Sequence, residues 1–214
     1  MIRVGVLAGG EGRRMGGDKP LKVIGKKPMV YWVVKTLRCI SLPVYISVKT
    51  SHQAEKIKTE LVNSGVKGEE FVFVFDRYPE IPGPISGIVS LLSREDGQGC
   101  FLISAVDQPL LDLRFLNYLS VLSNIFCHRF VIVTKTKEKI HPFPGIYPTY
   151  LKDLVEHFLK TCKKRSLYRL FMELKSIGAV FFLNESNPNM SNTSLLNINT
   201  PETLRMVEDV FTRA

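Results

Sequence analysis

The sequence contains few cysteines and no apolar stretch long enough to cross a bilayer. The four cysteines form no C-x-x-C pair, which argues against a zinc knuckle or a disulfide framework. They are Cys39, Cys100, Cys127 and Cys162. The apolar start is interrupted by Arg3 and runs into glycines and arginines, so it does not read as a secretory signal. From these absences we expect a cytoplasmic protein without a membrane anchor.

Two common phosphate-binding motifs are also absent. A Walker loop requires Gly-Lys followed by Ser or Thr, whereas Gly17 is followed here by Asp18. The dinucleotide fingerprint G-x-G-x-x-G starts at Gly10, but Met15 occupies the position of its third glycine. The sequence therefore predicts neither a P-loop NTPase nor a dinucleotide-dependent oxidoreductase.

The composition is that of an ordinary globular protein. The chain has 214 residues, of which 45% are hydrophobic and 23% charged, enough for one domain with a substantial core. Its formal net charge of +9 indicates an anionic partner, which admits nucleic acid, a membrane surface or a phosphorylated small molecule. Most lysines are dispersed. The densest cationic cluster, a candidate local anion site, comprises Lys160, Lys163, Lys164, Arg165 and Arg169.

The most informative segment follows the first apolar run, at residues 2–7. Residues 8–19 contain five glycines, which allow the backbone to approach a ligand closely and to turn its N–H groups toward oxyanions. Arg13, Arg14 and Lys19 add positive charge to the same loop. The segment therefore predicts a nucleotide phosphate site.

Apolar runs and helical periodicity alternate along the whole chain. Strands are expected near residues 2–7, 43–48, 71–75, 100–105, 129–134, 179–183 and 194–198. Helices are expected at 29–39, 52–63, from Pro84 onward, and at 112–126, 148–161, 166–176 and 201–212. This alternation predicts a single-domain α/β protein of Rossmann-like type, with a mostly parallel sheet of about seven strands and helices on both faces. Ligands of such folds bind beyond the carboxyl ends of the strands.

Several short motifs, taken in order, resemble those of molybdenum cofactor guanylyltransferases, a family of the nucleotidyltransferase superfamily. They are Leu7-Ala8-Gly9-Gly10, Arg14-Met15-Gly16, Asp18-Lys19, Asp76, residues 82–87, Val106-Asp107-Gln108-Pro109, His141-Pro142, Arg165-Ser166-Leu167 and residues 197–202. The resemblance covers nearly the whole chain. It implies an enzyme that transfers GMP from magnesium-bound GTP to the terminal phosphate of Mo-molybdopterin. It also implies one nucleotidyltransferase domain over 1–214, its N-terminal part binding GTP and Mg²⁺ and its C-terminal part facing molybdopterin.

The resemblance assigns catalytic roles to three residues. Asp107 follows the apolar run 101–106 and matches the family's magnesium ligand, which also belongs to the nucleotide site. Lys19 matches the lysine that contacts the nucleotide's phosphates, and Arg14 is expected to assist it. An aspartate at a strand–helix junction is also a common helix cap, so that role remains open for Asp107.

The guanine nucleotide site implied by the resemblance includes Leu7, Ala8, Gly9 and Asp76. A carboxylate suits the donors of a base or ribose, although an aspartate after a strand can also serve a turn. Guanylyl enzymes of this superfamily tend to show Leu-Ala-Gly-Gly where cytidylyl enzymes show Leu-Ala-Ala-Gly. Gly9 therefore favours GTP over CTP.

The chain departs from the family at the end of its second predicted strand. The family has an asparagine there, whereas residues 46–50 read Ile-Ser-Val-Lys-Thr, so Ser47 or Lys49 could supply a different contact. Asn197 and Asn199 are expected on one face of the last predicted strand, near the active site. Arg165 and its basic neighbours are the candidates for the second substrate.

Other functions are compatible with part of this pattern. A related enzyme could use CTP or a sugar phosphate, and a nucleotide-binding regulator could have lost catalysis. Nucleic-acid binding is not expected, because no basic helix with interleaved aromatic residues is evident. The expected partners are thus GTP, Mo-molybdopterin and the proteins that deliver molybdopterin or mature molybdoenzymes.

Overall fold

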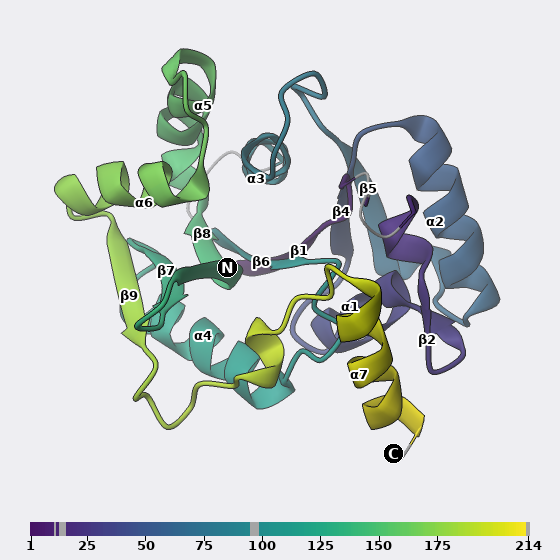
Figure 1. The fold of residues 1–214 in the computed structure, drawn as a ribbon. Helices are drawn as coiled ribbons and strands as arrows, with labels where there is room; N and C mark the ends of the chain where they lie inside the picture. The colour runs from purple at the N-terminus through teal and green to yellow at the C-terminus, as the bar shows by residue number, and fades with distance from the viewer. Residues whose placement is uncertain (11, 13–15, 95–98, 213–214) are drawn as a thin grey trace.

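One seven-stranded sheet organises the chain in this computed structural model, which describes residues 1–10, 12, 16–94 and 99–212 (Figure 1). Its strands are β1 (Ile2–Leu7), β4 (Val44–Val48), β5 (Phe71–Phe75), β6 (Cys100–Ala105), β7 (Val131–Lys135), β8 (Ile140–Pro148) and β9 (Val180–Asn184). Their order across the sheet is β5-β4-β1-β6-β8-β7-β9. Two short strands, β2 (Val23–Ile24) and β3 (Lys27–Pro28), form a separate hairpin.

The sheet is parallel apart from β8. β1 pairs in parallel with β4 and β6, β4 with β5, and β7 with β9, whereas β8 runs antiparallel between β6 and β7. The carboxyl ends of β1, β4, β5 and β6 therefore lie along one edge of the sheet. The predicted fold class is confirmed.

Helices cover both faces of the sheet. The helices are α1 (Met29–Leu37), α2 (Ser51–Asn63), α3 (Ile85–Leu92), α4 (Leu113–Ile125), α5 (Lys152–Thr161), α6 (Leu167–Ser176) and α7 (Pro201–Thr212). Buried residues of α1, α2 and α4 pack on one face, and those of α3, α5 and α6 pack on the other (Figure 1). None of the helices within the described residues is long and apolar enough to cross a membrane.

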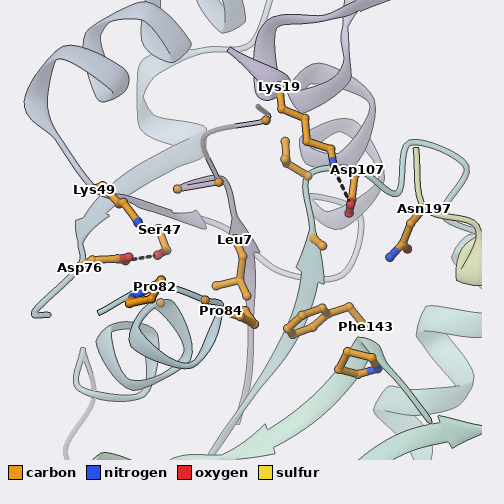
Figure 2. Close-up of a pocket in the computed structure, with 18 of the residues that line it drawn as sticks. Leu7, Lys19, Ser47, Lys49, Asp76, Pro82, Pro84, Asp107, Phe143 and Asn197 are labelled. Atoms are coloured by element: carbon orange, nitrogen blue, oxygen red, sulfur yellow. Dashed lines mark hydrogen bonds and ion pairs between the residues drawn. The ribbon is translucent and has the colours of Figure 1, made fainter. Parts of the chain in front are cut away.

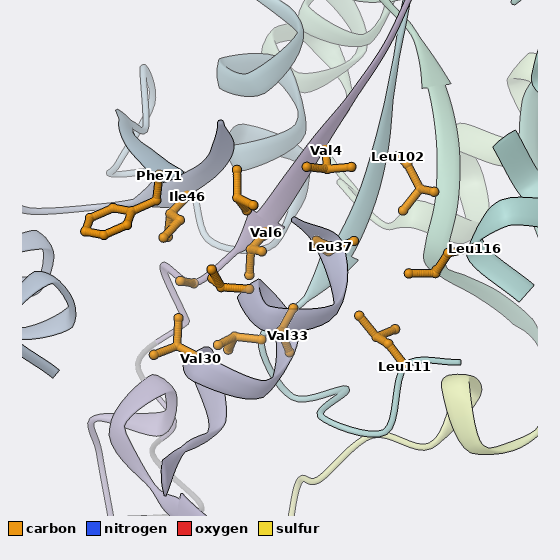
Figure 3. Close-up of a cluster of buried hydrophobic side chains, with 14 of the residues drawn as sticks. Val4, Val6, Val30, Val33, Leu37, Ile46, Phe71, Leu102, Leu111 and Leu116 are labelled. Atoms are coloured by element: carbon orange, nitrogen blue, oxygen red, sulfur yellow. The ribbon is translucent and has the colours of Figure 1, made fainter. Parts of the chain in front are cut away.

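The alternation of side chains along β1 and β6 divides the core into two layers. Val4, Val6 and Leu102 point to the layer that contains α1, where Val33 and Leu37 are fully buried (Figure 3). Phe101, one residue from Leu102, lies in the opposite layer with α3. This period of two is what a strand buried on both faces requires.

Close packing against α3 explains one glycine inside β1. A Cβ atom on Gly5 would lie 2.8 Å from Leu91 Cδ1 of α3, closer than carbon atoms approach. Its absence lets α3 sit directly on the strand. α3 in turn begins at the edge of the sheet where β1 ends.

The sequence missed β8 and wrongly predicted a strand at 194–198. Pro142 and Pro144 argue against a strand, because proline donates no ladder hydrogen bond. In the structure they fall where the register with β7 shifts, between the pairs Thr134–His141 and Ile132–Ile146.

The predicted strand at 194–198 is instead a 3₁₀ turn over Thr193–Leu195 followed by irregular chain. Its apolar residues Leu195 and Ile198 are buried against the core without joining the sheet. The other predicted strands agree with the structure within two residues at each end. Burial alone therefore produced the strand-like pattern.

Candidate functional site

A cavity of about 600 Å³ opens at the edge of the sheet where four parallel strands end. Each of these strands contributes its last residues or the residues that directly follow it. The lining includes Leu7, Gly9 and Gly10 from β1, Ser47 and Lys49 from β4, Asp76 from β5, and Ala105, Val106 and Asp107 from β6. Figure 2 shows two polar ends of this cavity, with Leu7 between them. The structure brings these distant segments together at one edge of the sheet, as predicted.

The first polar end is an ion pair between Lys19 and Asp107. Lys19 Nζ lies 2.7 Å from Asp107 Oδ2, and it also donates to Asn199 Oδ1 at 2.7 Å. The side chains of Lys19 and Asp107 are each only 12% exposed. Two residues 88 positions apart thus hold opposite charges together at the cavity wall, while the phosphate and magnesium roles predicted for them stay predictions.

Asp107 keeps one oxygen free for a ligand. Among the described residues, its Oδ1 atom has no hydrogen-bond partner although it is buried. Asp107 does not cap the following helix, because that role belongs to Asp112, whose Oδ1 accepts from Arg114 N at 2.8 Å. The cap interpretation of Asp107 is therefore wrong, and its carboxylate retains an unpaired oxygen of the type that a hard cation prefers.

The single carboxylate of Asp107 suits Mg²⁺ that is bound together with substrate phosphates. It does not suit a metal ion that only protein side chains hold. Within the described chain, no group of three or more His, Cys, Asp or Glu residues could hold a metal ion. Mg²⁺ is commonly bound through one or two carboxylates together with substrate phosphates and water. Asp107 supplies one such carboxylate, so a cation here would need a phosphate ligand to complete its shell.

The position of Asp107 is fixed by its neighbours. Its carbonyl accepts from Ile198 N at 2.8 Å, which holds the segment with Asn197 and Asn199 beside the site. The buried Gln108 side chain donates to the carbonyls of Phe143 (2.6 Å) and Ser194 (3.1 Å). Since these bonds link β6, β8 and the 193–199 segment, the carboxylate emerges from a rigid junction.

The glycine-rich loop brings Lys19 to the site. A Cβ atom at Gly12 would lie 2.6 Å from Lys19 Cβ, and Gly12 also has a φ of +61°. Only glycine satisfies both conditions at low cost. Lys19 then opens a 3₁₀ turn over Lys19–Leu21. Arg14, predicted to assist Lys19, lies outside the described residues.

The second polar end is built around Asp76. Its Oδ1 accepts from Ser47 Oγ at 2.6 Å, and Lys49 lies beside the same cavity wall (Figure 2). Burial raises the pKa of the Asp76 carboxyl above its ordinary value of 3.8, whereas the Ser47 hydrogen bond and the Lys49 charge oppose that rise. Ser47, one of the two residues predicted to supply a different contact at this strand end, therefore holds the Asp76 carboxylate in place.

Three predicted nucleotide-site residues lie at the end of β1 or directly after it. Leu7 and Gly9 line the cavity, and a Cβ atom at Gly9 would lie 3.2 Å from Lys49 Cγ. Ala8 is fully buried, its N–H donates to Ser47 O at 2.9 Å, and its carbonyl accepts from Gln53 Nε2 at 2.9 Å. Its backbone groups thus serve the fold, and the role predicted for it in nucleotide binding stays a prediction.

The sequence missed the wall formed by β8 and α6. Pro142 and Phe143 of β8 and Leu167 at the start of α6 line the cavity opposite the glycine loop. The His141-Pro142 and Arg165-Ser166-Leu167 motifs touch this wall, but neither predicted that Phe143 and Leu167 line the cavity. Asn197 lines the cavity as expected, although not from a strand.

The basic cluster around Arg165 lies apart from this cavity. Arg165 Nε donates to the carbonyl of Leu159 at 2.6 Å, which ties the α5–α6 connection together. Of the cluster Lys160, Lys163, Lys164, Arg165 and Arg169, none is among the described residues that line the cavity. The role predicted for Arg165 toward the second substrate stays a prediction.

Comparison with known proteins identifies relatives over most of the chain. A family model described as "MobA-like NTP transferase domain" matches residues 4–177. A probable molybdenum cofactor guanylyltransferase from Aquifex aeolicus (strain VF5) is 31% identical over 203 residues, covering 94% of this chain and 88% of that protein.

Two solved structures illustrate the shared fold. Molybdopterin-guanine dinucleotide biosynthesis protein A from Archaeoglobus fulgidus superposes with a TM-score of 0.77 at 22% identity, covering 100% of both chains. The 4-diphosphocytidyl-2C-methyl-D-erythritol synthase of Anaerococcus prevotii superposes with a TM-score of 0.73 at 14% identity, covering 100% of this chain and 96% of that chain. At these identities the likeness concerns the fold alone, so the architecture does not distinguish between guanylyl and cytidylyl transfer.

Proposed function

The chain belongs to the MobA-like NTP transferase family and is a nucleotidyltransferase, and from this premise we propose that it transfers GMP from GTP to the terminal phosphate of Mo-molybdopterin. The products are molybdopterin guanine dinucleotide and pyrophosphate. The observation that supports this most is the division of one cavity into two ends. A carboxylate, Asp76, stands at one end, and the Lys19–Asp107 ion pair stands at the other.

This division suits a nucleoside triphosphate. The Asp76 carboxylate can accept from donors on guanine or ribose, while Lys19 and the glycine-loop amides suit the phosphates. Between the two ends, Leu7 and the segment Pro82, Gly83 and Pro84 supply apolar walls for the nucleoside. The acceptor would then enter past Phe143 and Asn197, beside Asp107.

The reaction needs no general base to activate the attacking group. The attacking group is a phosphate oxygen that is already anionic, so it forms a bond to the α-phosphorus while the bond from that phosphorus to the pyrophosphate oxygen breaks. Lys19 offsets the charge that moves onto pyrophosphate, and its bonds to Asp107 and Asn199 aim the ammonium group. Mg²⁺ bound by Asp107 would neutralise phosphate charge and orient the triphosphate. Positioning and electrostatics thus supply the catalysis.

We propose that this reaction takes place in the cytoplasm. The acceptor would come from proteins that deliver molybdopterin, and the product would pass to proteins that mature molybdoenzymes. Neither nucleic acid nor a membrane is part of the proposal.

The nucleotide preference is tested at Gly9. A methyl group on Gly9 would meet Lys49 Cγ at 3.2 Å and narrow the end of the cavity that contains Asp76. Because a purine needs more room than a pyrimidine, Gly9→Ala should weaken GTP binding about tenfold and leave CTP binding within about twofold, a difference of about 1.4 kcal/mol. Calorimetric titration with GTP, CTP and ATP in the presence of Mg²⁺ measures both.

Gly10→Ala is the matched control. A Cβ atom at Gly10 has no heavy atom within 4 Å, so the added methyl group should leave the GTP to CTP ratio unchanged. Wild-type protein should prefer GTP over CTP and ATP. A wild-type preference for CTP, or equal effects of the two alanines, would refute the guanylyl assignment at this position.

Protonation of Asp76 should weaken GTP binding. Because burial raises the pKa of this carboxyl, its charged form is lost at a higher pH than for an exposed aspartate as the solution is acidified. We therefore expect GTP affinity to fall on acidification, starting at a higher pH than an exposed aspartate would give. Asp76→Asn should bind about tenfold more weakly at pH 7, the worth of one charge-assisted hydrogen bond.

Two variants distinguish the pH dependence caused by Asp76 from that caused by the GTP phosphates, which also change charge with pH. The Asp76→Asn protein should lose the part of the pH dependence that belongs to the carboxyl. Ser47→Ala removes the hydrogen bond that lowers the Asp76 pKa, so its loss of affinity should begin at a higher pH than in wild type. Identical pH profiles for all three proteins would exclude Asp76 from the nucleotide site.

A further inference from the structure

We propose that the end of the acceptor opposite its reacting phosphate is anionic and binds in a second, lysine-lined cavity between the β7–β8 hairpin and α6. This inference rests on the proposed function and adds a site for the distal part of the second substrate. The cavity measures about 530 Å³, comparable with the first.

The two cavities adjoin along β8. Pro142 and Leu167 line both of them. A smaller cavity of about 220 Å³ lies between them, sharing Phe143 and Asn197 with the first and Lys139 and Ile140 with the second. An elongated ligand can therefore reach from Asp107, past Phe143, to the β7–β8 hairpin.

The second cavity carries an excess of positive charge. Four lysines line it, and Glu138 is its one carboxylate among the described residues. The lysines are Lys135, Lys137, Lys139 and Lys175. A cleft dominated by one sign of charge raises the local concentration of a ligand of opposite charge. The site thus suits an anionic group.

An apolar floor lies beneath these lysines. Phe171, Met172 and Phe182 line the cavity, and Lys135 Nζ stands 5.9 Å from the centre of the Phe182 ring. A flat heterocycle can rest on such a surface while its charged substituents meet the ammonium groups. The combination of floor and charges matches a pterin that carries an anionic metal centre better than it matches a simple phosphate.

The hairpin that presents the lysines is held in place. Thr136 N donates to Lys139 O at 2.9 Å, which closes the turn between the strands. Lys137 N donates to Glu185 Oε2 at 3.0 Å, which ties the turn to the segment after β9. The lysine side chains therefore extend from a fixed backbone.

The orientation of the nucleotide leaves this side for the acceptor. Asp76 and Lys49 lie at the end of the first cavity opposite Asp107 (Figure 2), and strands β1 and β6 lie between β4 and the β7–β8 hairpin. Arg165, the cation predicted for the second substrate, is absent from the described lining of both cavities. The hairpin lysines, which look dispersed in the sequence, take that role here.

The test compares two charge-reversed proteins. Lys137→Glu with Lys139→Glu reverses two charges at the second cavity, and Lys58→Glu with Lys67→Glu reverses two exposed lysines, one within α2 and one beyond its end. The KM for Mo-molybdopterin should rise about tenfold or more in the hairpin variant, with the KM for GTP within about twofold. The control should keep both constants. Equilibrium binding of Mo-molybdopterin without nucleotide, followed by ultrafiltration, gives a readout independent of turnover.

Each result decides between the two proposals. If wild type transfers GMP but the hairpin variant keeps its acceptor KM, or if the control changes equally, the second cavity is not an acceptor site. If wild type makes no product yet binds Mo-molybdopterin, and only the hairpin variant loses that binding, the site stands while the proposed reaction fails. Absence of both transfer and binding in wild type would overturn both.

Discussion

Replacing Asp107 with asparagine should lower kcat/KM for GMP transfer by about 10²–10⁴-fold, the effect expected when a metal ligand or a comparable electrostatic contact is lost. Asparagine preserves the shape of the side chain and an acceptor oxygen, but it removes the negative charge that faces Lys19 at 2.7 Å. Steady-state kinetics with labelled GTP and Mo-molybdopterin measure the loss. The dependence of kcat/KM on Mg²⁺ concentration should also weaken in this variant.

The protein should remain folded. Leaving Lys19 without its carboxylate costs about 1–3 kcal/mol, since Asn199 Oδ1 still accepts from the ammonium group. That is a fraction of the 5–15 kcal/mol typical of a domain. Asp18→Asn is the matched control, because Asp18 is 62% exposed, lies next to Lys19 in sequence and pairs with Lys56 instead. Equal activity loss in both variants, or full activity in Asp107→Asn, would exclude Asp107 as the metal ligand.

Replacing Lys19 with methionine should lower kcat by about 10²–10³-fold, with a smaller change in the KM for GTP. The reason is that charge accumulates on the leaving pyrophosphate in the transition state, where a positioned ammonium group matters most. Single-turnover measurements isolate this step from product release. Methionine retains the length and much of the volume of the lysine stem, which packs against Gly12.

Lys22→Met provides the comparison for the same loop. Lys22 follows the 3₁₀ turn that Lys19 begins and is not among the described residues of the cavity. Its loss should change kcat by less than about twofold, because this half-buried side chain does not line the cavity where the phosphates are expected to bind. If Lys19→Met raises the KM for GTP while leaving kcat intact, Lys19 contributes ground-state binding and not transition-state stabilisation.

Much of the fold follows from the sequence because its strands are buried on both faces. Runs such as 71–75 and 100–105 stand out as apolar segments bounded by turn residues, and amphipathic helices separate them. β8 could not be predicted this way. Its prolines break the local pattern, and only the register shift against β7 makes room for them.

The sequence predicted those site residues that directly follow a strand. Asp76 and Asp107 each come after an apolar run, and the carboxyl ends of parallel strands share one edge. The Ser47–Asp76 hydrogen bond depends on the pairing of β4 with β5, which no local pattern specifies. Phe143 was missed for the same reason as β8, since it belongs to that strand, and the hairpin lysines were missed because their turn can be located only once β8 is known.

The most direct test of guanylyl transfer is a competition between GTP and CTP, each labelled at its α-phosphate, for purified wild-type protein with Mo-molybdopterin and Mg²⁺. We expect labelled GMP in the dinucleotide product, little labelled CMP, and loss of the product in Asp107→Asn. Preferential incorporation of CMP would contradict the guanylyl assignment and identify a cytidylyl enzyme. Failure to label molybdopterin with either nucleotide would contradict the proposed reaction itself.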